Sequence, residues 1–125
     1  MRWWVLITLT GCAAGDRVRP ETLATSLGDA RFYVVDVRSD REWQGPRGHV
    51  PGATHLAWPE VTREAGSLAP GPDQTVVLVC YTGHRSRWSM RAVREAVTVP
   101  VVDLKGGMLA WWKRDLPVSV EPADQ

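Results

Sequence analysis

Cys80 is the residue in this sequence that is best placed to do chemistry. It follows an apolar run at 75–79, which predicts a central buried strand, and it opens the segment Cys-Tyr-Thr-Gly-His-Arg-Ser at 80–86, ahead of a predicted helix. Backbone N–H groups of such a turn would point toward the sulfur, and His84 and Arg85 could add positive charge. Because the thiolate is the reactive form of cysteine, the segment predicts a nucleophile. A small buried side chain without chemistry is the alternative.

Strands and helices alternate along the predicted domain. Short runs of β-forming residues predict the strands, and capping residues or an i, i+4 apolar spacing predict the helices. The alternation indicates an α/β fold with a mainly parallel central sheet and helices on both faces, in which ligands bind beyond the carboxyl ends of the strands. The longest helix is expected to bury Trp88, Ala92, Val93, Ala96 and Val97. The predicted strands are 32–37, 53–56, 75–79 and 99–104, and the predicted helices are 20–27, 40–44, 60–64, 85–97 and 108–114.

Length and composition limit the class of protein. A chain of 125 residues fits one domain, and a hydrophobic fraction of 44% excludes general disorder. Lys and Arg number 15 against 14 for Asp and Glu, and the resulting net charge of +1 argues against a nucleic-acid partner. Two cysteines exclude a disulfide framework, and the absence of a Cys/His cluster argues against a metal site. We expect a monomer.

The N-terminus resembles a signal for export and lipidation. Arg2 precedes the apolar run 3–10, which is far shorter than the roughly 20 residues of a membrane-spanning helix. The run ends in Leu-Thr-Gly-Cys at 9–12, which resembles the lipobox of bacterial lipoproteins. That resemblance implies a signal peptide at 1–11, lipidation of Cys12, a tether at 12–17 and a membrane anchor on the periplasmic side of the bacterial cell envelope. Secretion without lipid and a buried N-terminal strand are the alternatives.

Four segments, in the same order, resemble the rhodanese-like sulfurtransferases. The segment 80–86 is similar to the active-site loop of that family, Cys-x-x-Gly-x-Arg-Ser. Val-Asp-Val-Arg at 35–38 with Glu-Trp at 42–43, Gly-His-Val-Pro-Gly-Ala at 48–53 and Leu-Lys-Gly-Gly-Met-Leu-Ala-Trp at 104–111 are similar to its other motifs. The resemblance implies a single rhodanese-like domain at 18–119, with 120–125 as a tail. The stretch 44–47 is longer than the usual spacing by about two residues, and we interpret it as a surface loop.

The resemblance implies a sulfurtransferase that needs no metal or organic cofactor. The Cys80 thiolate would attack the outer sulfur of thiosulfate or a related anionic donor, and the persulfide would then pass its sulfur to cyanide or a thiol. Arg85 is expected to bind the sulfonate end of the donor, because a guanidinium can bind two oxygens at once. The expected substrate-binding residues are Tyr81, Thr82, Gly83, His84, Arg85 and Ser86.

Other functions remain open on the sequence alone. The domain could be a binding or sensing module in which Cys80 turns over poorly, or a redox protein in which Cys80 cycles through sulfenic acid. The phosphatases related to this fold use Cys-x5-Arg, which would put the arginine at position 86, where this chain has Ser86. The shorter loop favours a single sulfur atom over a phosphate group.

Several nearby residues have two interpretations. Asp36 and Arg38 could line the rim of the site, but a structural ion pair is favoured. His49 is expected to support its Pro-Gly turn rather than act as a base. Trp58 could form a wall of the site but is expected in the core, and His55 has no evident partner. A solvated helix face, which could also attract anionic donors, is expected from Arg87, Arg91 and Arg94.

Overall fold

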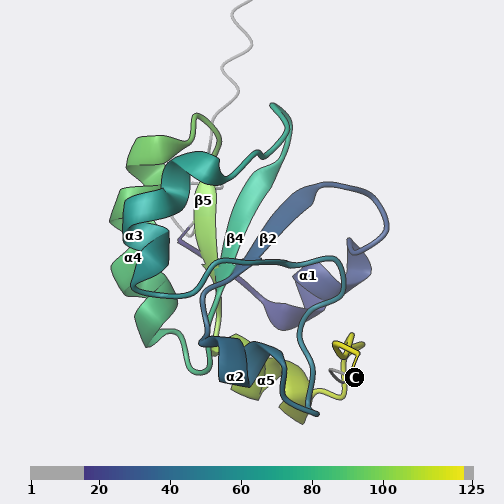
Figure 1. Ribbon diagram of the computed structural model, residues 1–125. Helices are drawn as coiled ribbons and strands as arrows, with labels where there is room; N and C mark the ends of the chain where they lie inside the picture. Colours follow the sequence, from purple (N-terminus) through teal and green to yellow (C-terminus); the bar gives the residue numbers. More distant parts are fainter. Residues whose placement is uncertain (1–15, 123–125) are drawn as a thin grey trace, which may run out of the picture.

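A parallel five-stranded sheet forms the middle of the domain (Figure 1). The computed structural model describes residues 16–122. The strand order is β1-β5-β4-β2-β3, and all neighbouring strands run parallel. The apolar run that precedes Cys80 is the central strand, as predicted. The strands are β1 (Arg17–Val18), β2 (Phe32–Asp36), β3 (Thr54–His55), β4 (Thr75–Val79) and β5 (Val101–Leu104).

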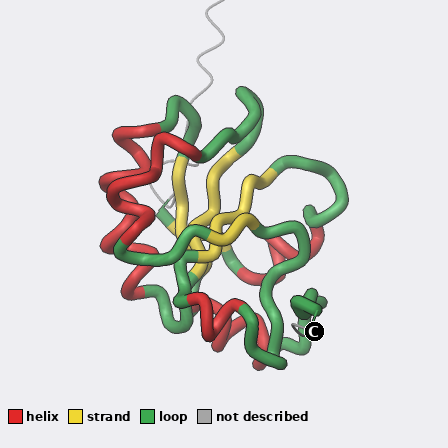
Figure 2. Tube along the Cα trace, in the orientation of Figure 1, coloured by secondary structure: helices red, strands yellow, loops and turns green. Residues whose placement is uncertain are grey.

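Helices cover both faces of this sheet (Figures 1 and 2). Val61 of α3 and Val93 of α4 belong to the apolar cluster on one face, and Leu23 of α1 and Trp111 of α5 belong to the cluster on the other. The predicted α/β fold is therefore confirmed, and the predicted boundaries differ by one to a few residues. The helices are α1 (Pro20–Thr25), α2 (Asp40–Trp43), α3 (Glu60–Glu64), the 3₁₀ turn η1 (Ala65–Ser67), α4 (His84–Ala96) and α5 (Gly107–Lys113).

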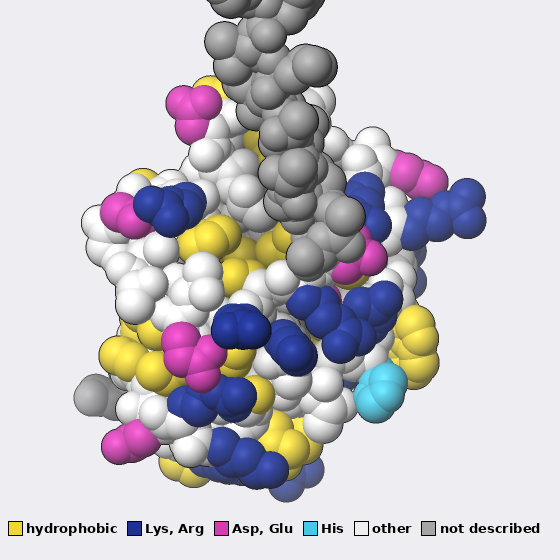
Figure 3. Space-filling view, turned by 180° about the vertical axis from the view of Figure 1, so that it is seen from behind, with side chains coloured by type: hydrophobic (Ala, Val, Ile, Leu, Met, Phe, Trp, Pro, Cys, Tyr) yellow, Lys and Arg dark blue, Asp and Glu magenta, His cyan; other side chains and the backbone are white. Residues whose placement is uncertain are grey.

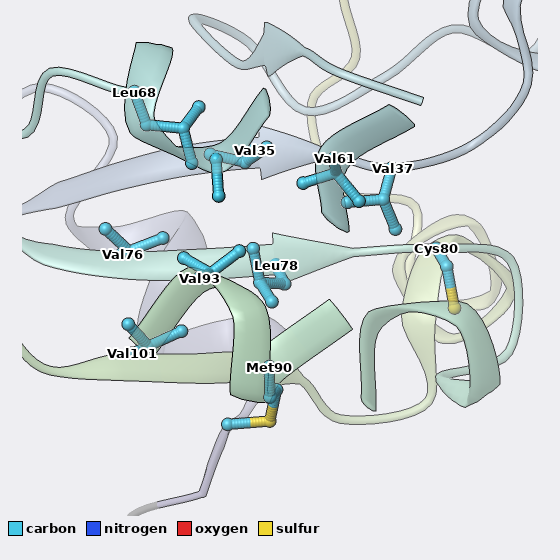
Figure 4. Close-up of a cluster of buried hydrophobic side chains, with 11 residues drawn as sticks. Val35, Val37, Val61, Leu68, Val76, Leu78, Cys80, Met90, Val93 and Val101 are labelled. Atoms are coloured by element: carbon cyan, nitrogen blue, oxygen red, sulfur yellow. The ribbon is translucent and has the colours of Figure 1, made fainter. Parts of the chain in front are cut away.

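The alternation of side chains along β4 decides where the sulfur of Cys80 lies. Val76 and Leu78 point to the α4 side of the sheet, whereas Val77 and Val79 point to the α1 and α5 side. Because successive strand residues face opposite sides, Cys80 continues the first set. Figure 4 shows it at the end of that cluster, next to the loop that leads into α4.

The sheet contains an N-terminal strand that the sequence did not reveal. The predicted tether includes Arg17, but Arg17 and Val18 form β1 and pair with Asp103 and Leu104 of β5. The Asp103 N–H also donates to the carbonyl of Asp16. The tether assignment is therefore wrong for residues 16 and 17. Such a short strand has no apolar periodicity of its own, and its pairing with β5 creates it.

The buried face of α4 differs from the predicted one. Trp88 is 63% exposed and Ala96 is exposed, whereas Ser86, Ser89, Met90 and Val93 are buried. The two serines are buried because their hydroxyl groups donate to the carbonyls of Gly83 and Arg85 at 3.1 and 2.8 Å. A hydroxyl that has a hydrogen-bond acceptor can be buried in a core. The buried face predicted from apolar residues alone is therefore rotated by part of a turn from the observed one.

The segment after α5 packs back onto the domain. His49 and Ser119 form an antiparallel bridge. The Glu121 carboxylate accepts a 2.8 Å hydrogen bond from His49 Nε2. The stretch 44–47 is a surface loop, as interpreted from its length. Part of the expected tail at 120–125 is thus anchored through Glu121.

Candidate active site

The loop between β4 and α4 holds the Cys80 sulfur against backbone donors. Cys80 is 1% exposed, and the Gly83 N–H donates to its Sγ with an N···S distance of 2.8 Å. Gly83 is the residue before α4 and has φ +110°, a conformation that side-chain-bearing residues rarely adopt. The first N–H groups of α4 have no acceptor within the helix, as in any α-helix, and no side chain caps them. These groups and the helix dipole favour a sulfur anion here.

The start of α5 holds this loop from behind. The Met108 N–H donates to the Cys80 carbonyl at 2.8 Å, and the Leu109 N–H donates to the Tyr81 carbonyl at 3.0 Å. A Cβ at Gly107 would lie 2.5 Å from both of these carbonyl oxygens, and Gly107 has φ +61°. The Gly-Gly segment is therefore part of the loop architecture, because only a glycine at 107 lets α5 approach this closely.

Arg85 is held by a carboxylate from the neighbouring helix α2. Its Nη1 and Nη2 donate to Glu42 Oε1 and Oε2 at 2.5 and 2.8 Å. The hydrogen bonds from Arg85 lower the pKa of Glu42 to about 2, against the opposing effect of burial, and Ser39 adds to the lowering. The same hydrogen bonds raise the pKa of Arg85, and the nearby Cys80 acts in the same direction.

Glu42 is a residue that we did not predict at the site. It is also the third residue of α2 and forms a capping box, in which the Ser39 hydroxyl accepts from the Glu42 N–H and the Glu42 carboxylate accepts from the Ser39 N–H. The Ser-x-x-Glu pattern at 39–42 is a sequence signal for a helix start, but not for an active-site residue. Its link to Arg85 follows from the packing of α2 beside the loop.

Asp103 on β5 is a second residue near the site that the sequence did not predict. Ser86 Oγ is 3.6 Å from Cys80 Sγ and 3.4 Å from Asp103 Oδ2. Asp103 is 1% exposed, and burial raises its pKa. A charged residue in the apolar run Val-Val-Asp-Leu was the available signal, since such a residue is seldom buried without a partner.

Asp36 and Arg38 form a buried ion pair rather than a rim. Arg38 Nε and Nη2 donate to the carboxylate of Asp36 at 3.0 and 2.8 Å, and both side chains are 1% exposed. Arg38 Nη2 also donates to the carbonyl of Gly48. The pair therefore ties the end of β2 to the turn at 48–53 and does not line the mouth of the site.

His49 and His55 support the region around the Asp36–Arg38 pair. Trp43 is stacked between His49 and His55, with ring centroids 3.5 and 4.8 Å away. His49 Nδ1 bonds the Val50 carbonyl, which confirms that His49 supports its turn, and His55 Nε2 bonds the Arg38 carbonyl at 2.7 Å. His55 thus has the partner that the sequence did not show.

Several exposed side chains lie on the loop or near it. Tyr81, Thr82 and His84 are exposed, and Thr82 Oγ1 lies 3.0 Å from His84 Nδ1. Trp58 is 38% exposed and its ring lies 5.6 Å from that of Trp88, so the prediction that Trp58 belongs to the core is wrong. An adjacent open pocket of about 570 Å³ is lined by Ser39, Asp40, His55, Leu56, Ala57, Trp58, Pro59, Glu60 and Glu64.

Basic side chains gather on the face that Figure 1 turns away from the viewer (Figure 3). Arg91 of α4 is 90% exposed, and Arg87 and Arg94 are 44% and 45% exposed. These values confirm the predicted solvated face of the helix. Arg94 pairs with Asp16, which connects the end of this face to the start of the sheet.

Two further points concern metals and membranes. Within residues 16–122, no group of three or more His, Cys, Asp and Glu side chains is arranged to hold a metal ion. In the same part of the chain, no helix has the length and apolar character to cross a membrane. Cys12 and the predicted signal peptide lie outside the described residues.

The chain is similar to known proteins in both sequence and structure. The sequence profile described as Rhodanese-like domain matches residues 19–114. Probable adenylyltransferase/sulfurtransferase MoeZ of Mycobacterium tuberculosis is 33% identical over 109 residues, which are 86% of this chain and 27% of that protein. This chain therefore spans about a quarter of the length of that relative.

Two other matches have different coverage. A protein named Sulfurtransferase from Allochromatium vinosum is 26% identical over 104 residues, which are 82% of this chain and 94% of that one. The crystal structure of thiosulfate sulfurtransferase from Pseudomonas aeruginosa superposes with a TM-score of 0.74 at 27% identity, and covers 86% of this chain and 20% of that chain. The similarity thus includes nearly all of the described part of the chain.

Proposed function

Because the chain belongs to the rhodanese-like domain family, we propose that it is a sulfurtransferase that carries sulfane sulfur as a persulfide on Cys80. Relatives named as sulfurtransferases support the general reaction class. The donor is thiosulfate or a related small anion, and the acceptor is cyanide or a thiol. This reaction needs neither a metal nor an organic cofactor.

The observation that carries the proposal is the contact between Cys80 and the start of α4. The Gly83 N–H lies 2.8 Å from Sγ, in a loop that closes within six residues, from Cys80 to Arg85. A thiolate at this position gains a hydrogen bond and a favourable helix dipole. The same donors would serve the terminal sulfur of a persulfide, since that atom also carries negative charge.

The transfer has two steps. The Cys80 thiolate attacks the outer sulfur of thiosulfate, a new S–S bond forms at Cys80, and the S–S bond of thiosulfate breaks so that sulfite leaves with the electron pair. Cyanide or a thiolate then attacks the outer persulfide sulfur, and the Cys80 thiolate leaves. Arg85 is assigned to the sulfonate oxygens of the donor, with Glu42 fixing the orientation of its guanidinium.

The other loop residues have smaller assigned roles. Gly83 contributes its N–H, and Ser86 places a hydroxyl beside Sγ. Tyr81, Thr82 and His84 are exposed around the loop, where they would contact the donor or acceptor. His84 is turned toward Thr82, so the imidazole supports the loop before any substrate is bound.

Thiocyanate formation from thiosulfate and cyanide tests the proposal. The Cys12→Ala chain leaves Cys80 as the only cysteine, and its Cys80→Ala derivative is the matched control. We expect thiocyanate from the first protein and none from the second, and mass spectrometry should find one added sulfur on Cys80 after thiosulfate treatment. Failure of the Cys12→Ala chain with both assays would reject the proposal. An added oxygen in place of sulfur would indicate redox chemistry instead.

A lipid anchor at Cys12 is a separate proposal, supported by the resemblance of residues 9–12 to a lipobox. Lipidation would place the domain at the periplasmic side of a bacterial membrane. Expression of the full chain and of Cys12→Ala in a bacterium tests it. Membrane fractionation and the mass of the N-terminal peptide should show lipid on the first protein and not on the second, and an unmodified Cys12 would reject it.

A further inference from the structure

Asp103 lies behind the active-site loop with half of its carboxylate unsatisfied. Its Oδ2 is 3.4 Å from Ser86 Oγ, whereas its Oδ1 is buried and has no hydrogen-bond partner within residues 16–122. Arg17 Nε from β1 and Arg87 Nη1 from α4 each lie 3.8 Å from Oδ1, which is too far for a hydrogen bond. A buried carboxylate in this state needs an explanation.

The Ser86 hydroxyl connects this carboxylate to the nucleophile. Ser86 is fully buried, and its Oγ has three acceptors within reach: Gly83 O at 3.1 Å, Asp103 Oδ2 at 3.4 Å and Cys80 Sγ at 3.6 Å. A hydroxyl has one proton to donate. The three acceptors therefore compete for it, and the outcome depends on their charges.

We propose that Asp103 is a positioning residue that controls, through the Ser86 hydroxyl, how strongly the anionic sulfur of Cys80 is stabilised. The proposal rests on the proposed function of Cys80 as the sulfur carrier. When Asp103 is ionised, its carboxylate attracts the Ser86 proton away from Cys80. When Asp103 is protonated, it donates to the Ser86 oxygen, and the Ser86 proton is shared between the two acceptors that remain, the Gly83 carbonyl and Sγ.

Two arginines and one hydroxyl face the Asp103 carboxylate. Burial raises its pKa, and Arg17, Arg87 and the Ser86 hydroxyl act in the opposite direction. The arginines come from two different elements and keep their charge at all relevant pH values, as does Arg85 beside Cys80. Apart from Cys80 itself, Asp103 is therefore the group in this cluster whose charge can change while the positive charges remain constant.

This arrangement has a chemical consequence for the sulfur. A thiolate that receives one hydrogen bond fewer forms at higher pH, but it is a stronger nucleophile once formed. Ionised Asp103 therefore reduces the stabilisation of the sulfur anion and increases its intrinsic reactivity. Both effects are measurable on Cys80 without any sulfur donor.

Alkylation of Cys80 by iodoacetamide, followed from about pH 4 to about pH 10, tests the proposal. The protein is the full chain with Cys12→Ala, compared with the same chain carrying Asp103→Asn. We expect the midpoint of the Asp103→Asn profile to lie about one pH unit lower. We also expect its plateau rate to be about threefold lower, because nucleophilicity falls as the anion is stabilised.

Matched variants separate this role from a structural one. Glu95→Gln removes a carboxylate from the exposed side of α4 and should leave the profile unchanged. In the Ser86→Ala background, Asp103→Asn should produce a smaller shift, because the connecting hydroxyl is gone. An equally large shift in the Ser86→Ala background would overturn the role of Ser86. Coincident profiles for the Cys12→Ala chain with and without Asp103→Asn would overturn the proposal.

Two precautions keep the outcomes distinct. If Asp103→Asn does not fold, as judged by circular dichroism, Asp103→Ser replaces it, with the same expected direction of shift. The thiocyanate assay on the Cys12→Ala chain decides separately whether Cys80 transfers sulfur. A shifted alkylation profile without thiocyanate would therefore support the role of Asp103 and reject the proposed reaction.

Discussion

Two arginine–carboxylate pairs beside the active site have the same bidentate form in different surroundings. In the Asp36–Arg38 pair both side chains are 1% exposed. In the Glu42–Arg85 pair the side chains are 31% and 25% exposed. The first pair joins the end of β2 to the turn at 48–53 through Gly48, and the second joins helix α2 to the loop that contains Cys80.

The difference in exposure determines what each pair can do. A fully buried arginine that loses its carboxylate becomes an unpaired charge in a medium that solvates it poorly, so the Asp36–Arg38 pair cannot open during turnover. A partly exposed arginine can exchange hydrogen bonds with water or an anion at low cost. We therefore assign stability to Asp36–Arg38 and donor binding to Glu42–Arg85.

Arg38→Met should have the largest effect on stability. The substitution leaves Asp36 buried without its partner, and we expect the free energy of unfolding to fall by about 3–5 kcal/mol. Urea denaturation followed by circular dichroism measures it. Arg91→Met, at a 90% exposed position, is the control and should change stability by less than about 0.5 kcal/mol. A loss as small as that of the control would remove the distinction between the two pairs.

Arg85→Ala should have a larger effect on catalysis than on stability. Loss of a guanidinium that binds the donor should reduce kcat/KM for thiosulfate by about a hundredfold, while the unfolding free energy falls by no more than about 1 kcal/mol. Steady-state thiocyanate formation measures the rate, with Arg91→Ala as control. Arg85→Lys should recover only part of the loss, because an ammonium lacks the planar fork. Full activity of Arg85→Ala would assign the donor to other groups.

Glu42→Gln should have a smaller effect on donor binding than Arg85→Ala. Removal of the carboxylate charge leaves the positive charge of Arg85 uncompensated, so the KM for thiosulfate should fall by about threefold. The comparison is made against Asp40→Asn, a neighbouring exposed carboxylate on α2. A higher KM in Glu42→Gln would mean that orientation of Arg85 by Glu42 outweighs the charge that it neutralises.

Acid should weaken the Glu42–Arg85 pair over a defined range. Arg85 lowers the pKa of Glu42 from its usual 4.5 to about 2, so the contribution of this pair to stability is present above pH 4.5 and is lost as the pH falls from 4.5 toward 2. The difference in unfolding free energy between the protein and Glu42→Gln should therefore shrink over that range. A difference that stays constant down to pH 2 would contradict the assigned cause of the shift.

Much of the fold could be predicted from local patterns. The β4 run, the short helix that begins at residue 40 and the alternation of strands and helices each depend on neighbouring residues, and the structure confirms them. The strand β1 and the exposure of Trp88 and Trp58 were not predictable in this way. A two-residue strand exists only through its partner, and an aromatic side chain is buried only where the fold provides a covered position.

The sequence by itself determined the chemistry that this protein can offer. It specifies one thiol at the end of a central strand, a glycine that permits φ +110° before α4, and an arginine five residues after the thiol. Only the tertiary structure decided which carboxylates lie beside the active-site loop. Glu42 lies 43 residues from Arg85, and Asp103 lies 17 residues from Ser86. Contacts at such separations leave no periodic signal in the chain, because packing of α2 and β5 against the loop creates them.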